Sequence, residues 1–106
     1  MIFYTFQLPK VSLNEWYAGT HWTKRKKMKD IYRMIIGKHN ITTPCEVDYD
    51  FEFKFRPLDC SNCVAMVKMI EDCLFENDSP KIVKSIKISS RKSNKDQVTL
   101  KINYDL

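Results

Sequence analysis

The chain has 106 residues, a length that supports one hydrophobic core but not two, so we expect a single domain spanning residues 1–106. Hydrophobic residues make up 43% and aromatic residues 12% of the chain, which excludes an intrinsically disordered protein. The formal net charge of +5 favours a polyanionic partner, although many small basic proteins bind no nucleic acid.

The N-terminal segment MIFYTFQLPK has no basic first part, no long apolar run and no small-residue cleavage site, so we do not expect a signal peptide. No stretch approaches the ~20 apolar residues of a membrane span. We therefore expect a cytoplasmic protein without membrane contact, in which the cysteines are reduced.

The first 22 residues predict a strand and an irregular arm. Residues 2–7 are apolar and aromatic, which is typical of a short strand. Residues 8–22 are interrupted by Pro9 and Gly19 and predict irregular structure.

A helix is predicted to follow this arm. Thr20 or Thr23 is placed to cap it, and Gly37 is placed to end it. The residues at helical spacing that predict its apolar face are Met28, Ile31, Tyr32 and Ile35.

Basic residues crowd the first turns of this helix. Cations at a helix N-terminus oppose the helix dipole, at roughly 0.3–1 kcal/mol each when exposed. Such a cluster indicates a surface that faces phosphate, and a solvated charged face is the alternative. The residues predicted to bind DNA are Trp22, Lys24, Arg25, Lys26, Lys27 and Lys29.

The second half of the chain predicts a strand, a helix and two further strands. Residues 46–55 alternate strictly between apolar and charged side chains, and Pro57 ends this strand. A helix is predicted over 62–75, and strands over 82–90 and 97–104. The core face of that helix is expected to contain Cys63, Met66, Val67, Met69, Ile70, Cys73 and Leu74.

The resulting order, β-α-β-α-β-β, predicts a single small α+β domain with a mixed sheet.

Two cysteines have the spacing of half a zinc site. Cys60-x-x-Cys63 matches one ligand pair, but Cys45 and Cys73 stand alone and both histidines are far away in the sequence. Because Cys63 and Cys73 fall on the apolar face of the helix, we favour a packing role over a zinc-stabilised interaction module.

The polar face of the same helix carries candidate catalytic groups. Asp59 precedes the helix, and Asn62 is placed to cap it. The residues spaced four, three and four apart on the predicted polar face are Ser61, Ala65, Lys68 and Asp72.

Two further acids, Glu76 and Asp78, lie just before the next predicted strand. Carboxylates from a strand end, a helix face and a following loop are a ligand set that suits Mg²⁺. Such an ion activates water and stabilises a phosphodiester transition state, and Lys68 would assist. The alternative is an ordinary Lys–Asp pair one helical turn apart, together with two acids in a turn.

The segments LPKVSLNEWY, HWTKRKKMK and above all LDCSNCVAMVKMIEDCLFENDSPKIV resemble the RusA family of Holliday-junction resolvases, which is common in bacteriophages and prophages. The resemblance covers most of the chain. The residues that match the family pattern in order are Asp59, Asn62, Lys68, Asp72 and Asp78.

The resemblance implies a homodimeric, phage- or prophage-encoded endonuclease that makes paired nicks in branched DNA in the bacterial cytoplasm. It implies Mg²⁺ as cofactor, with Mn²⁺ as a substitute. Asp59 and Asp78 would be metal ligands, Lys68 the catalytic lysine and Asn62 an organiser of the site. The aromatic residues expected to hold unstacked bases are Trp16, Tyr17 and Trp22.

The chain departs from the family pattern at Ser61, where well-known members have a second Asp. The segment 62–68 is also longer than in those members, and the link 72–78 is shorter. Either Asp72 or Glu76 replaces the missing ligand, or the protein binds branched DNA without cutting it.

Overall fold

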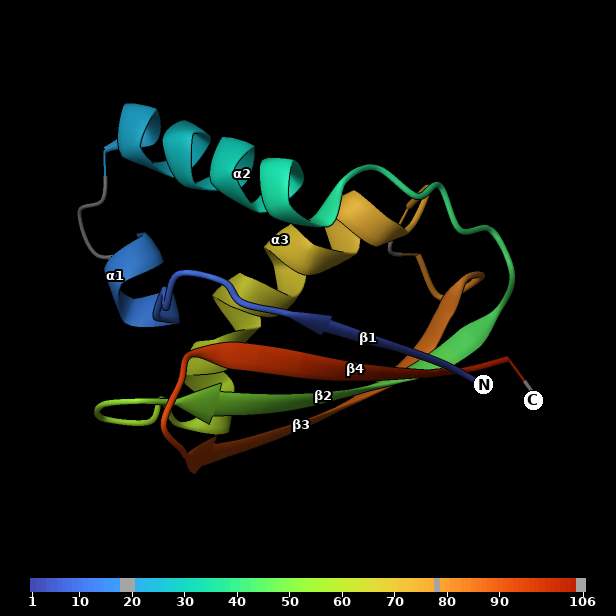
Figure 1. Cartoon of the computed structure of the whole chain (residues 1–106). Coiled ribbons are helices and arrows are strands. Elements are labelled where there is room, and N and C mark those ends of the chain that lie inside the picture. The colour runs from blue at the N-terminus through green and yellow to red at the C-terminus, as the bar shows by residue number, and fades with distance from the viewer. Residues whose placement is uncertain (18–20, 78, 105–106) are drawn as a thin grey trace.

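The computed structural model describes residues 1–17, 21–77 and 79–104. Its four strands form one sheet in the order β1-β4-β2-β3, and the helices lie on one face of that sheet (Figure 1). The predicted α+β class, element order and mixed sheet are confirmed, with one additional short helix. The elements are β1 (Ile2–Phe6), α1 (Leu13–Tyr17), α2 (Trp22–Ile36), β2 (Cys45–Phe53), the 3₁₀ helix η1 (Cys60–Cys63), α3 (Val64–Leu74), β3 (Val83–Lys92) and β4 (Gln97–Asn103).

Strand β2 organises the sheet because it pairs with β4 on one side and with β3 on the other. The β2–β4 pair is antiparallel, and the β2–β3 pair is parallel. The apolar residues of β2 alternate as predicted and point toward the helices. The five that are at most 1% exposed are Cys45, Val47, Tyr49, Phe51 and Phe53.

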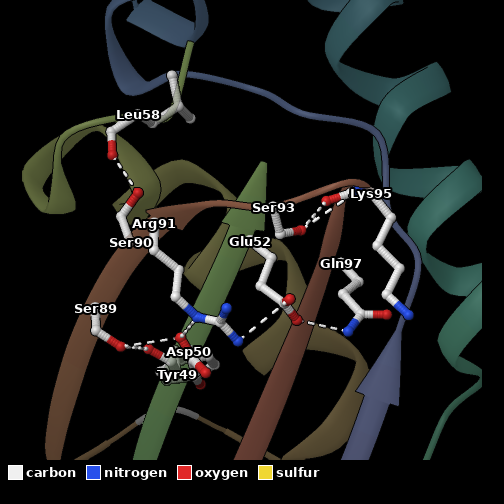
Figure 2. A network of polar contacts seen from close by, with 10 residues as sticks. All are labelled: Tyr49, Asp50, Glu52, Leu58, Ser89, Ser90, Arg91, Ser93, Lys95 and Gln97. Carbon is white, nitrogen blue, oxygen red and sulfur yellow. Dashed lines mark hydrogen bonds and ion pairs between the residues drawn. The ribbon is translucent and has the colours of Figure 1, made fainter. Parts of the chain in front are cut away.

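The opposite face of the sheet is open and polar. Figure 2 shows Arg91 of β3 reaching across to Asp50 and Glu52 of β2, at 3.5 and 3.2 Å. Gln97 of β4 donates a hydrogen bond to Glu52 at 2.5 Å. Asp50 and Glu52 therefore link neighbouring strands, in the way that cross-strand pairs stabilise a sheet.

Helix α3 lies between the sheet and α2, and eight of its eleven residues are buried. A helix covered on two sides is expected to be apolar nearly all round. The predicted core residues are confirmed. The expectation that Ala65 lies on a polar face is wrong, because its exposed fraction is 0%.

The helix predicted over 62–75 begins as the 3₁₀ turn η1 and becomes α-helical only at Val64. Its last turn is fixed by the segment 38–41. The carbonyls of residues 72–74 accept hydrogen bonds from that segment at 2.8–3.0 Å. These contacts satisfy carbonyls that a helix end leaves unpaired, and they anchor α3 beside the end of α2.

The predicted irregular arm contains α1, so that part of the prediction is wrong. Ser12 accepts a hydrogen bond from the backbone N–H of Glu15 at 3.0 Å, and its hydroxyl donates to the Glu15 carboxylate at 3.3 Å. The sequence Ser-x-x-Glu is that of a capping box, and the Ser12 side chain makes the capping hydrogen bond of that motif, which explains how five residues form a helical turn here.

Helix α2 differs from the prediction in the residue that caps its N-terminus and in the isoleucine that it buries. The side chain of His21 accepts from the N–H of Thr23 and caps the helix, while Thr20 lies outside the described residues. Gly37 ends the helix with φ of 85°, as expected. Ile36 is buried, whereas Ile35, predicted to pack, is 43% exposed.

Across the described ranges, none of the helices combines the length and apolar composition that a bilayer crossing requires.

We predict that Tyr32→Phe lowers the free energy of unfolding by about 1–3 kcal/mol, because it removes a buried hydrogen bond. Tyr32 is 0% exposed, and its hydroxyl donates to the carbonyl of Pro9 at 2.6 Å. Urea unfolding at neutral pH measures the change. Tyr104→Phe, at a partly exposed position, is the control and should change stability by less than about 0.5 kcal/mol. Equal effects of the two substitutions would contradict a stabilising contribution of the hydrogen bond between Tyr32 and Pro9.

Candidate functional site

Lys68 and Asp72 are the two exposed residues of α3. They lie one turn apart, yet their side chains form no ion pair with each other or with another described residue.

Asp59 and Asn62 lie at the start of the helical segment. Asp59 is exposed, and its side chain makes no capping hydrogen bond. The prediction that Asn62 caps the helix is wrong, because its Oδ1 accepts from the backbone N–H of Asn14 at 3.3 Å. Asn62 thus ties the start of α1 to η1, beside exposed Ser61.

The loop around Asp59 is held against the second half of β3. Ser90 donates to the carbonyl of Leu58 at 2.5 Å, and the thiol of Cys60 donates to the carbonyl of Ile88 at 3.4 Å. Asp59 is therefore fixed near the C-terminal part of β3.

Asp72 lies in the last turn of α3, and Glu76 follows the end of that helix by two residues. Asp72 and Asp59 are separated by roughly 20 Å, at about 2.0 Å per residue in η1 and 1.5 Å per residue in α3. Mg²⁺ contacts its ligands at about 2.0–2.1 Å, so one ion cannot touch both residues of one chain. Asp78 lies outside the described residues.

Glu71 is an acid of this region that the sequence analysis missed. It is 8% exposed and lines two hollows, one shared with Lys68 and β3 and the other shared with Asp72. Burial, and after it the charge of Glu71, raise the pKa of the Tyr49 hydroxyl. The signal was present in the sequence, because position 71 lies four residues after Val67 and three before Leu74, on the buried face.

Within residues 1–17, 21–77 and 79–104, no three histidine, cysteine, aspartate or glutamate side chains lie close enough together to hold one metal ion.

The predicted DNA-binding residues divide between two sides of α2. Arg25 packs over the ring of Trp16 at 5.8 Å, and Lys24 lines a small hollow that includes Glu15 and Trp16. Trp16 is only 9% exposed and is not available to stack on a base. The Tyr17 side chain lies outside the described part, and Trp22 is 67% exposed.

Three of the cysteines belong to the core. Cys45, Cys63 and Cys73 are buried, in line with the packing role that we favoured. Burial raises the pKa of the Cys63 thiol to about 11, which keeps it protonated and unreactive. Cys60 is exposed.

Comparison of the chain with models of protein families, with curated proteins and with solved structures finds no match. The resemblance to the RusA family therefore rests on the residue pattern alone.

We predict that a thiol reagent modifies Cys60 rapidly in the native protein and the three buried cysteines slowly, because the reagent needs an accessible thiolate. Mass spectrometry after brief labelling at neutral pH counts the modified sites. The urea-unfolded chain, in which all four thiols are accessible, is the control. Rapid native labelling of Cys63 would show that η1 opens readily and would contradict its place in the core.

Proposed function

We propose that the protein is a Mg²⁺-dependent endonuclease that resolves branched DNA, of the RusA resolvase type, and that it acts as a homodimer. One observation carries this proposal. The fold buries most of α3 and leaves exposed Lys68 and Asp72, which are the lysine and the aspartate of the RusA pattern. Among the described residues, neither side chain forms an ion pair.

In this proposal Mg²⁺, when bound, supplies an activated water and neutralises charge on the scissile phosphate. Asp59 and Asp78 hold the ion, and Asp72 or Glu76 replaces the carboxylate that Ser61 lacks. The ammonium group of Lys68 offsets negative charge that develops on the phosphate during the reaction.

A second chain could place Asp59 and Asp72 close together, although these residues lie too far apart in one chain to share an ion. Asp59 directly precedes η1 and Asp72 lies in the last turn of α3, so the two residues lie at opposite ends of that helical segment. A two-fold axis perpendicular to the segment, beside its middle, would bring Asp59 of one chain near Asp72 of the partner, and it would do so twice. A homodimer of this kind has two sites, as paired nicks require.

A protein that binds branched DNA without cutting it is the second candidate. Two observations favour it. Ser61 offers no carboxylate, and no three metal-binding side chains gather within the described part of one chain. Cleavage of a synthetic four-way junction with Mg²⁺ or Mn²⁺ separates the two candidates.

We predict that Asp59→Asn and Asp78→Asn each abolish junction cleavage and leave junction binding nearly unchanged, because each removes a ligand charge without removing bulk. Cleavage is followed by gel electrophoresis, and binding by fluorescence anisotropy in the absence of divalent ions. Asp48→Asn, an equivalent change at an exposed site on the open face of the sheet, is the matched control and should cut at the wild-type rate. Wild-type cleavage by either test variant would refute the assignment of the metal ligands.

We predict that Ser61→Asp maintains or raises Mg²⁺-dependent cleavage, because it restores the carboxylate that the family pattern has at this exposed position. Initial cleavage rates over a series of Mg²⁺ concentrations provide the measurement. Ser61→Asn adds similar bulk without charge and should give no gain. If Ser61→Asp lost activity with its circular dichroism spectrum unchanged, position 61 would not face the metal.

A further inference from the structure

A groove runs between α2 and the C-terminal end of α3, with a volume of about 430 Å³. Basic residues from α2 and the turn after it form one wall, and acidic residues from α3 and the loop after it form the other. The charged residues that line it are Lys29, Arg33, Lys38, Glu71, Asp72 and Glu76.

The basic wall continues along one side of α2. Lys26, Lys29 and Arg33 follow one another at steps of three and four, so they lie on the same face of the helix. Trp22 lies one turn before Lys26 and is 67% exposed. We call the row formed by Trp22, Lys26, Lys29, Arg33 and Lys38 the basic track.

The basic side chains of the basic track form no strong ion pairs with described acidic residues. Within the described ranges, neither Lys29 nor Arg33 has an acidic partner within 4.0 Å. Lys26 pairs with Asp30 at 3.1 Å, but both side chains are more than half exposed, and such pairs contribute little. Lys38 donates to the carbonyl of Asp72 rather than to a carboxylate.

The other basic residues of α2 behave differently. Arg25 is packed on Trp16, and Lys24 faces the same side, toward α1. The basic cluster is thus divided into a part that packs against α1 and a part that borders the groove.

The dimensions of the basic track match one strand of nucleic acid. From Trp22 to Arg33 the helix rises about 16 Å, at 1.5 Å per residue. A DNA strand carries one charge per about 3.4 Å of helix axis, so several phosphates lie beside this length. An exposed tryptophan at one end offers a surface on which a base can stack.

We infer that the basic track holds the sugar–phosphate backbone of one DNA strand, with Arg33 and Lys38 as phosphate contacts at the groove. The guanidinium of Arg33 suits a phosphate because it can donate two parallel hydrogen bonds. The track leads toward Asp72, one of the acids that we place in the catalytic site. This inference rests on the proposed action on DNA, but it does not depend on cleavage.

The test uses the full-length double variant R33Q/K38Q and a fluorescent four-way junction, with binding measured by anisotropy over a series of salt concentrations. We expect affinity to fall roughly 10- to 100-fold near 0.1 M salt, and the salt slope to fall by about 1.8, or 0.9 for each lost contact. The matched control is K87Q/K101Q, which removes the same charge from the open face of the sheet. It should leave the slope unchanged. R33K/K38R keeps both charges and should retain the wild-type slope.

An unchanged salt slope in R33Q/K38Q would overturn the inference. An equal loss of slope in K87Q/K101Q would also overturn it, because that result would indicate a general effect of net charge.

If wild-type protein binds no DNA, the inference and the proposed function both fail. If R33Q/K38Q alone weakens binding but the wild-type protein does not cut, the basic track stands and the endonuclease proposal fails. If wild-type protein cuts and R33Q/K38Q binds and cuts equally well, the proposed function stands and the basic track is refuted.

Discussion

Burial of α3 between the sheet and α2 is the constraint on which the rest of the structure depends. Because the helix is covered on two sides, its sequence is apolar at nearly every position, and Lys68 and Asp72 remain as its exposed residues. The same packing fixes the path of α3. Asp59 lies just before η1 and Asp72 in the last turn of α3, so the geometry of the candidate site is a consequence of how the core is packed.

Much of the fold could be predicted from local pattern. The alternation in β2 and the apolar positions of α3 follow from burial, which acts on every residue of those elements. Several details of the fold were not predicted, and two of them have a clear cause. Helix α1 was missed because its Ser-x-x-Glu cap spans only one turn between a proline and a glycine. Ile35 was placed in the core instead of Ile36 because three consecutive apolar residues, Met34, Ile35 and Ile36, end this helix, and tertiary contacts decide which of them is buried.

The candidate site could be predicted only in part. The residue pattern identifies Asp59, Lys68 and Asp72, and the rise per residue of a helix already implies that residues at its two ends cannot share one ion. The structure adds that the loop around Asp59 is held against β3 by hydrogen bonds from Ser90 and Cys60. Glu71 was overlooked because it is an acid at a core position. The basic residues of α2 form one cluster in the sequence, but in the structure they lie on two sides of the helix. Arg25 faces α1 because it packs over the ring of the buried Trp16.

Mixing two inactive variants tests the central claim, a nuclease site shared between two chains, most directly. Asp59→Asn and Asp72→Asn are purified separately, then combined under conditions that exchange subunits, and nicking of a four-way junction is measured with Mg²⁺. If each site takes Asp59 from one chain and Asp72 from the other, a mixed dimer contains one intact site, so the mixture should regain nicking that neither variant shows alone. A mixture as inactive as its components would contradict the shared site, and so would wild-type cleavage by Asp72→Asn alone.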